Sequence, residues 1–116
     1  MKDPWVQLGH LIDWSRLEKD FSSFYCADNG RPGGSIRLMV GLCIIKNKEG
    51  ISNEQVCNRW QRDPYFQYFC GEQYFQHHLP VKPQSLSNFY LRIGEEGQTR
   101  LLGETIKVGL VSNAYG

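Results

Sequence analysis

The chain has 116 residues, of which 41% are hydrophobic and 22% are charged, and its formal net charge is +1. This composition is typical of one globular domain and excludes a disordered, fibrous or collagen-like chain. The longest apolar run, residues 38–45, is too short to cross a bilayer, and the N-terminus lacks the pattern of a signal peptide. We therefore expect a cytoplasmic protein that does not span a membrane.

The first helix predicted along the chain covers residues 13–26. Asp13 is suited to an N-cap, because its carboxylate can accept hydrogen bonds from the free N–H groups of the first turn. Apolar residues then recur at helical spacing: Trp14, Leu17, Phe21 and Phe24. The turn-rich stretch 28–34 follows. We expect residues 1–30 to form an N-terminal helical arm and residues 31–116 to form one compact helical domain.

The central helix is predicted over residues 35–48. Apolar side chains lie almost all the way round it, which is typical of a helix buried on every side. Gly41 has a low helix propensity, but it allows a neighbouring element to approach closely. Gly50 is suited to the left-handed turn that ends such a helix.

A capping box marks the next helix. Ser52 and Gln55 have the spacing at which each side chain accepts a hydrogen bond from the other residue's backbone N–H. This helix is expected to run to about Trp60 or Gln61.

A short aromatic helix is predicted between Asp63 and Gly71. Asp63 can cap it, Pro64 has the φ angle of a first helical position, and Gly71 can end it. Because a helix of about two turns is not stable alone, we expect it to pack as a wedge between its two neighbouring helices. Its aromatic side chains are all predicted to be core: Tyr65, Phe66, Tyr68 and Phe69.

The last two helices are predicted on either side of Gly94. Ser85 is expected to cap the first, whose apolar face comprises Leu86, Phe89, Tyr90 and Ile93. The second runs from Glu95 to about Ser112. Its apolar stripe is predicted to be Leu102, Ile106 and Leu110, with Leu101 and Val108 beside it. Since no segment alternates long enough for a strand, the fold class is all-α, with five or six short helices.

Charge and cysteine patterns limit the possible ligands. Residues 31–62 hold six basic and two acidic side chains, so this segment can offer a local basic face in a nearly neutral chain. The cysteines are widely separated and, with three histidines, do not have the spacing of a zinc site. Free thiols on helix faces are the simpler interpretation, and we expect no metal or other cofactor in this chain. The four cysteines are Cys26, Cys43, Cys57 and Cys70.

Several stretches in order resemble the N-terminal region of bacterial insertion-sequence transposases of the IS-five type. The resemblance extends over roughly residues 8–111, and the joint occurrence of the stretches is specific although each alone is weak. These stretches are Leu11–Trp14, Gly30–Gly33, Ile36–Leu42, Asp63–Gly71, Phe75–His77 and Arg92–Gly97.

The resemblance implies a function. In that family, the helical region precedes an RNase H-like catalytic domain, in which three carboxylates bind two metal ions and drive DNA cleavage and joining. The helical region is regarded as a helix-turn-helix-like part that binds double-stranded DNA at the terminal inverted repeats of the element. We therefore expect a helix-turn-helix-like bundle that recognises these repeats.

The carboxylates of this chain do not fit the catalytic triad. Two-metal catalysis requires acidic residues that converge on the ions from a rigid framework. Here they fall at predicted helix starts or on predicted polar faces, and the chain stops about where the first catalytic strand of the family would begin. We expect no catalytic residue and no enzymatic activity in this chain, with a divalent metal only in the catalytic domain. The carboxylates are Asp13, Asp63, Glu95 and Glu96 at helix starts, and Glu18, Asp20 and Glu104 on polar faces.

The candidate DNA-reading helix is the one after Ser85. Ser85, Ser87 and Asn88 lie on its first turn and Arg92 lies one turn later, where a recognition helix contacts base edges. The helix from Ser52 is expected to support it. The basic side chains around this pair that can contact phosphates are Arg59, Arg62 and Lys82. The alternative is that Ser85 only caps the helix and that Ser87 and Asn88 face water.

Two alternative functions remain open. In one, the stripe of residues 14–24 mediates self-association or pairing with a full-length transposase, so that the chain is a protein-interaction module. In the other, the chain is an inactive remnant of a transposase.

Overall fold

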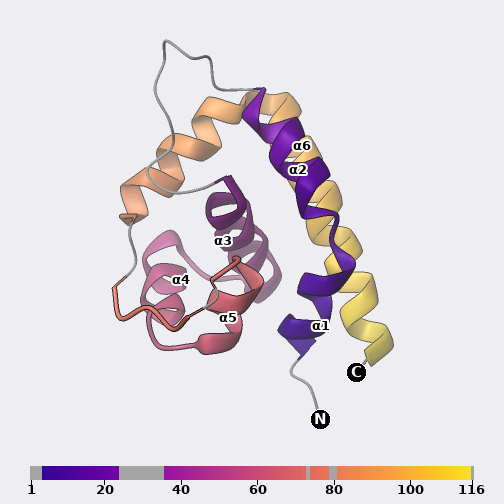
Figure 1. The fold of residues 1–116 in the computed structure, drawn as a ribbon. Helices are drawn as coiled ribbons and strands as arrows, with labels where there is room; N and C mark the ends of the chain where they lie inside the picture. The colour runs from indigo at the N-terminus through magenta and orange to yellow at the C-terminus, as the bar shows by residue number, and fades with distance from the viewer. Residues whose placement is uncertain (1–3, 24–35, 73, 79–80, 116) are drawn as a thin grey trace.

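The computed structural model describes residues 4–23, 36–72, 74–78 and 81–115, with side chains described up to Gly109 in the last of these stretches. The six helices are α1 (Pro4–Leu11), α2 (Trp14–Ser22), α3 (Ile36–Glu49), α4 (Asn53–Trp60), α5 (Pro64–Phe69) and α6 (Pro83–Tyr115). Because these parts of the chain contain helices and no strand, the all-α prediction is confirmed (Figure 1). None of the described helices is long and apolar enough to span a membrane.

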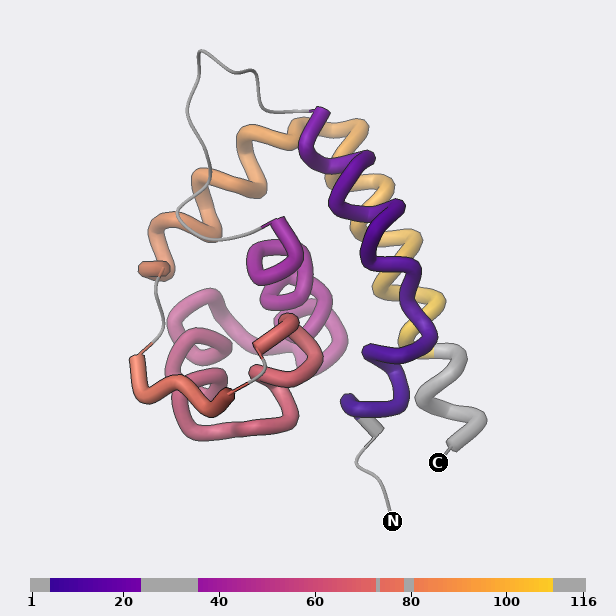
Figure 2. The backbone as a smooth tube through the Cα atoms, viewed as in Figure 1, coloured from indigo at the N-terminus to yellow at the C-terminus, as the bar shows by residue number. Residues whose placement is uncertain are grey.

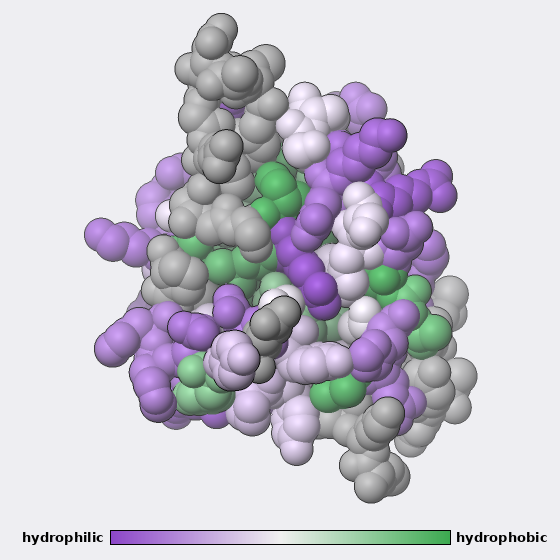
Figure 3. All heavy atoms as spheres, in the orientation of Figure 1, coloured by the Kyte–Doolittle hydropathy of each residue, from purple (hydrophilic) through white to green (hydrophobic). Residues whose placement is uncertain are grey.

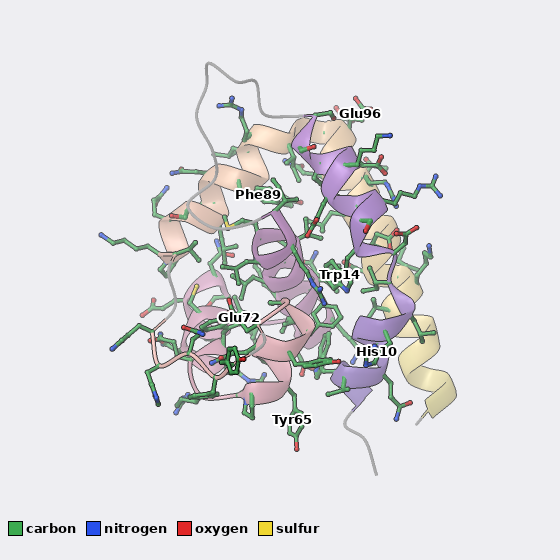
Figure 4. The ribbon with its side chains drawn as sticks, viewed as in Figure 1. His10, Trp14, Tyr65, Glu72, Phe89 and Glu96 are labelled. Atoms are coloured by element: carbon green, nitrogen blue, oxygen red, sulfur yellow. The ribbon has the colours of Figure 1, made fainter. Side chains whose placement is uncertain are left out.

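Helix α3 is the centre of the fold. All its residues from Leu38 to Ile45 are buried, as the nearly continuous apolar surface predicted. Figure 2 shows α6 as an arch, with its first half above α3 and its second half beside α1 and α2. Phe89 points from the first half of α6 toward this core and is 1% exposed (Figure 4). The core therefore lies between α3 and the helices around it.

Three predicted helix starts are confirmed by their caps. The Asp13 carboxylate accepts a hydrogen bond from the backbone N–H of Arg16 at 3.1 Å and caps α2. Ser52 and Gln55 form both hydrogen bonds of the capping box at the start of α4. Asp63 caps α5 by accepting hydrogen bonds from two backbone N–H groups. Local chemistry therefore determines where these helices begin.

Two glycines determine how close and at what angle helices can pack. Gly94 has φ 65° and ψ −170°, so the helical backbone is interrupted there and α6 consists of two halves, residues 83–93 and 95–115. Gly41 faces Cys70, because a Cβ atom at position 41 would lie 2.7 Å from the Cys70 sulfur. The predicted break at Gly94 and the predicted close approach at Gly41 are both confirmed.

The helix boundaries differ from the sequence prediction at three places. Residues 4–11 form α1, which the sequence analysis did not predict. Helix α2 ends at Ser22, and the last residues of the predicted segment 13–26 lie outside the described residues. Helix α6 begins at Pro83, so Ser85 lies inside its first turn and donates its N–H to the Lys82 carbonyl at 2.8 Å. The prediction that Ser85 is an N-cap is therefore wrong.

Helix α5 buries only half of its aromatic side chains. Phe66 and Phe69 are at most 1% exposed, whereas Tyr65 and Tyr68 are 46% and 41% exposed. The buried rings lie against α1, where the Trp5 ring packs edge-on to Phe66 and Phe69 at centroid distances of 5.6 and 4.8 Å. The predicted wedge between α4 and α6 is therefore wrong, because the unpredicted α1 covers α5.

The second half of α6 buries a different face from the predicted one. Leu101 and Val108 are 1% and 3% exposed, whereas Leu102 and Ile106 are 55% and 54% exposed. Glu104 lies on the same face as Leu101 and Val108 and is 5% exposed, so its predicted position on a polar face is also wrong. Because a carboxylate lies on the buried face, the sequence pattern indicated that this face was polar and that the neighbouring face was apolar. The Leu110 side chain lies outside the described residues.

Tyr90 is a further exception on the first half of α6. It was predicted to belong to the apolar face, but it is 41% exposed, while Leu86, Phe89 and Ile93 are each 1% exposed. The three buried side chains recur at three- and four-residue spacing, and Tyr90 lies at the margin of the face that they form.

Candidate nucleic-acid interface

A three-residue connection joins α3 to α4. Gly50 has φ 66°, a left-handed conformation that favours glycine, and the Ile51 N–H donates to the Lys46 carbonyl at 3.1 Å. Ile51 packs against the core, and Ser52 caps α4. The start and direction of α4 relative to α3 are therefore fixed by a short turn with its own hydrogen bonds.

Helix α4 has one buried face and one polar face. Val56, Cys57 and Trp60 are at most 3% exposed. Exposed polar side chains recur every four residues on the other face and its C-terminal extension: Glu54, Asn58 and Arg62. Such spacing places side chains in one row along a helix. At the lower left of Figure 3, hydrophilic side chains surround a small apolar patch.

Arg59 and Arg62 lie in a shallow groove where α4 meets α5. The Arg59 guanidinium lies 4.7 Å from the centroid of the Phe66 ring, and its Nη2 is 3.6 Å from the Glu49 carboxylate. Arg62 is exposed. Tyr65 also lines the groove and projects from α5 away from the body of the molecule (Figure 4). The structure thus places both predicted arginines at one end of α4, with Arg59 held by two neighbours.

The first half of α6 carries the other predicted site residues. The Ser87 hydroxyl accepts a hydrogen bond from the Asn53 amide at 3.0 Å, and both residues are half-buried. Asn88 is exposed and accepts a hydrogen bond from Gln84 at 3.0 Å. The Asn53–Ser87 contact therefore brings the first turns of α4 and α6 together.

Three further predicted residues lie on the first half of α6 or just before it. Ser85 is half-buried, whereas Lys82 and Arg92 are exposed. Of the three residues Ser85, Ser87 and Asn88 that were predicted to read DNA, only Asn88 has an exposed side chain. The basic residues nevertheless remain accessible on the first half of α6 and on the segment before it.

Gln67 positions the connector between α5 and α6, and the sequence analysis did not identify it. It is 1% exposed, and its amide N–H groups donate to the carbonyls of Trp60 and Gln76 at 2.9 and 2.8 Å. Its carbonyl accepts a hydrogen bond from the Gln76 N–H at 2.6 Å. In the sequence, the position of Gln67 among four aromatic residues was the only indication of this structural role. These bonds hold residues 74–78 against the end of α4.

The tryptophans are core residues rather than stacking surfaces for bases. Trp5 is 7% exposed and Trp60 is fully buried. Trp14 is half-buried, its indole N–H donates to the Gly9 carbonyl at 2.9 Å, and the Arg37 guanidinium lies 4.5 Å from the centroid of its ring. Burial lowers the pKa of Arg37. These contacts confirm the prediction that Trp14 and Trp60 belong to the core.

A cavity of about 160 Å³ lies on the opposite side, between α1, the start of α2 and the second half of α6. Burial disfavours the charged Arg100 side chain there, but hydrogen bonds to Glu104 and Asp20 outweigh burial and raise the pKa of Arg100. Lys107 lies 3.6 Å from the Glu104 carboxylate. The buried Glu104 is therefore balanced by two cations. Within the described part of the chain, no group of three His, Cys, Asp or Glu residues could hold a metal ion.

The fold and this surface define the class of protein: a helical domain whose buried central helix supports a polar face built from α4 and the first half of α6. A protein-family model described as "Transposase domain (DUF772)" matches residues 1–92. The chain therefore belongs to this transposase-domain family.

The chain is also similar to the "Uncharacterized protein ORF8 in nfe locus" of Rhizobium meliloti. The two are 38% identical over 105 residues, which cover 90% of this chain and 50% of that protein. The chain thus spans about half the length of the curated relative that it matches. No solved structure matches the chain.

Proposed function

We propose that this chain is a DNA-binding domain of an IS-five-type insertion-sequence transposase, acting in the cytoplasm on the terminal inverted repeats of its element. The observation that carries the proposal is the polar face joined by the Asn53–Ser87 hydrogen bond, in a chain of the transposase-domain family. Duplex DNA is recognised by polar side chains on helices, with basic side chains at the phosphates. The face offers both kinds of group.

The proposed phosphate contacts are Lys82 and Arg92, which are both exposed. Each cation that pairs with a phosphate releases a condensed counterion, so binding weakens as salt rises. The chain's net charge of only +1 favours a modest salt dependence, because few phosphates are neutralised.

We further propose that this region does not catalyse DNA cleavage. Asp13 and Asp63 cap α2 and α5, and Glu104 pairs with Arg100, so these carboxylates have structural partners. DNA binding by this chain is then expected to be independent of divalent metal. The proposal is supported if the chain binds DNA with the same affinity in excess EDTA and in Mg²⁺. The duplex should also remain without nicks. Metal-dependent nicking by the purified chain would contradict it.

The test of DNA binding uses fluorescence anisotropy with two labelled duplexes. One carries the inverted repeats that flank the gene, and the other has the same composition in scrambled order. We expect tighter binding to the repeats and a loss of affinity between about 50 and 200 mM salt. Absence of binding to both duplexes at about 50 mM salt would overturn the proposal.

A second candidate function is self-association, and one observation favours it. Leu102 and Ile106 are more than half exposed and lie one turn apart on the second half of α6. The stripe predicted for this role is instead used within the chain, since Leu17 and Phe21 are at most 2% exposed. Sedimentation velocity of the wild type and of Leu102→Glu is the test, with Leu91→Glu as an exposed control. A wild type that remains monomeric at high concentration contradicts this candidate.

A further inference from the structure

We propose that α3 and α4 form the helix-turn-helix unit of this domain and that α4, rather than the first half of α6, reads the bases. This inference rests on the proposed DNA-binding function and assigns its specificity to particular side chains. From the sequence, the helix after Ser85 was expected to read the bases and the helix after Ser52 to support it. Three features of the structure reverse these roles.

The first feature is the connection between the helices. A helix-turn-helix motif joins its two helices by three or four residues, often with a glycine. Helices α3 and α4 are joined by residues 50–52, and Gly50 has the left-handed φ of 66°. By contrast, α4 and α6 are separated by residues 61–82, which include α5. Of these two pairs, only α3–α4 has the connection of this motif. Residues 61–63 join α4 to the short helix α5 by an equally short segment, but that segment contains no glycine.

The second feature is the way the helices are buried. Helix α3 is buried throughout its middle, which suits the supporting helix of a motif. Helix α4 buries Val56, Cys57 and Trp60 and directs its other face outward. On α6, the Ser87 hydroxyl is already bonded to Asn53 and Ser85 is half-buried. Helix α4 therefore has the freer polar face.

The third feature is the chemistry of that face. Glu54, Asn58 and Arg62 are exposed and recur every four residues. In the major groove, arginine pairs with guanine, asparagine with adenine, and glutamate with the amino group of cytosine. An α-helix with its side chains is about 10–12 Å across and fits a major groove that is about 12 Å wide. Helix α4 thus carries Glu54 and Asn58, and Arg62 follows in the turn after it, so this region offers three types of base-reading side chain.

The other predicted residues then have a different role. With α4 in the groove, the neighbouring first half of α6 lies beside the DNA backbone, because the Asn53–Ser87 bond holds its first turn next to α4. Lys82, Asn88 and Arg92 are exposed there and suit phosphate contacts. These contacts would raise affinity for any duplex without selecting a sequence.

The experiment is a selection from a pool of duplexes with a randomised central window. It uses the wild-type chain, the α4 variants Asn58→Ala and Arg62→Ala, and the matched α6 variants Asn88→Ala and Arg92→Ala. All four side chains are exposed, and circular dichroism will verify that each variant folds. Affinities for the selected duplex and for its single-base variants are then measured at several salt concentrations.

We expect each α4 variant to lose discrimination at one base pair by about 5- to 150-fold, with the other positions unchanged. Asn88→Ala and Arg92→Ala should weaken all duplexes equally, and Arg92→Ala should reduce the salt slope by about one. Arg62→Lys provides a further control, because lysine keeps the charge but not the two-pronged geometry. It should lose base preference while the salt slope stays unchanged.

Two results overturn the inference and can be told apart. If the α6 variants change base preference and the α4 variants do not, α6 is the reading helix and only the present inference fails. If the wild type selects no sequence from the pool and shows no salt-dependent binding, the proposed function fails with it.

Discussion

Two of the contacts that attach the N-terminal helices to the rest of the domain depend on different forces. At α5, the Trp5 ring meets Phe66 and Phe69 edge-on, and Trp14 packs edge-on to Phe69 at 5.2 Å. At the second half of α6, Arg100 bridges Asp20 of α2 at 3.2 Å and the buried Glu104. We call these the aromatic contact and the ionic contact.

The difference between the two contacts indicates which of them contributes more to the stability of the domain. Aromatic pairs contribute about 0.5–1.5 kcal/mol each beyond the apolar area that they bury. Partly exposed ion pairs contribute about 0–1 kcal/mol, because water already solvates the separated charges. Asp20 and Arg100 are both more than a third exposed at their side chains, so their pair is of this weak kind. The aromatic contact should therefore dominate.

The largest expected effect is at the aromatic contact. Phe69→Ala should lower the free energy of unfolding by about 3–5 kcal/mol, because it leaves a cavity beneath Trp5 and Trp14. Urea unfolding measures this effect. Tyr65→Ala on the exposed face of α5 is the control and should lower the free energy of unfolding by about 1 kcal/mol or less, since this side chain is 46% exposed. A folded Phe69→Ala variant of wild-type stability that lost only DNA affinity would make this ring a contact surface instead.

Breaking the ionic contact should lower the free energy of unfolding by less than Phe69→Ala does. Arg100→Ala leaves the buried Glu104 with the Lys107 ammonium at 3.6 Å as a neighbouring cation, and we expect a loss of about 1–3 kcal/mol. The double variant Arg100→Met/Glu104→Leu should recover most of this loss, since apolar pairs often replace buried ion pairs without penalty. Thermal unfolding of the two variants is the measurement. Equal destabilisation of both would show that the residues act through packing rather than charge.

Alkaline pH should affect the apolar region and leave the ionic contact unchanged. Burial raises the pKa of Cys57 to about 11 and of Cys43 to about 12, and it also raises the pKa of Cys70. Because a thiol in the unfolded chain ionises near its ordinary pKa of 9.0, the native state loses stability as pH rises above that value. We expect a loss of about 1 kcal/mol per thiol by about pH 10.

Urea unfolding between about pH 8 and pH 10 measures this loss. A Cys26→Ser background removes the thiol that lies outside the described residues. In this background, the three buried thiols should react with iodoacetamide only as fast as the protein unfolds. Rapid labelling of the native protein at about pH 8 would contradict the burial of these side chains.

Local chemistry made some parts of this fold predictable. The caps at Asp13, Ser52 and Asp63 and the break at Gly94 each depend on one or two residues and their own backbone. Helix α1 was not predicted, although Asp3 and Pro4 repeat in the sequence the Asp–Pro pair that marks the start of α5. Its apolar residues Trp5 and Leu8 find their partners far along the chain. Long-range packing is invisible to local patterns.

The candidate site was only partly predictable for the same reason. The polar and basic residues of α4 and α6 were identified, but the Asn53–Ser87 bond joins residues 34 positions apart. Buried Gln67 was also missed, because its partners Trp60 and Gln76 belong to other segments. Residue types indicated which groups are available, whereas the tertiary contacts determine which of them remain exposed.

Two adjacent leucines on α6 give the smallest expected effect and a direct test of the correction to its apolar stripe. Leu102 is 55% exposed, so Leu102→Ala should change the free energy of unfolding by no more than about 0.5 kcal/mol. Leu101 is 1% exposed, and Leu101→Ala should cost about 2–5 kcal/mol. Since both changes are chemically identical and occur in one helix, helix propensity cancels and burial alone separates them. Equal losses in urea unfolding at a concentration where the chain is monomeric would mean that the second half of α6 is rotated from the position described.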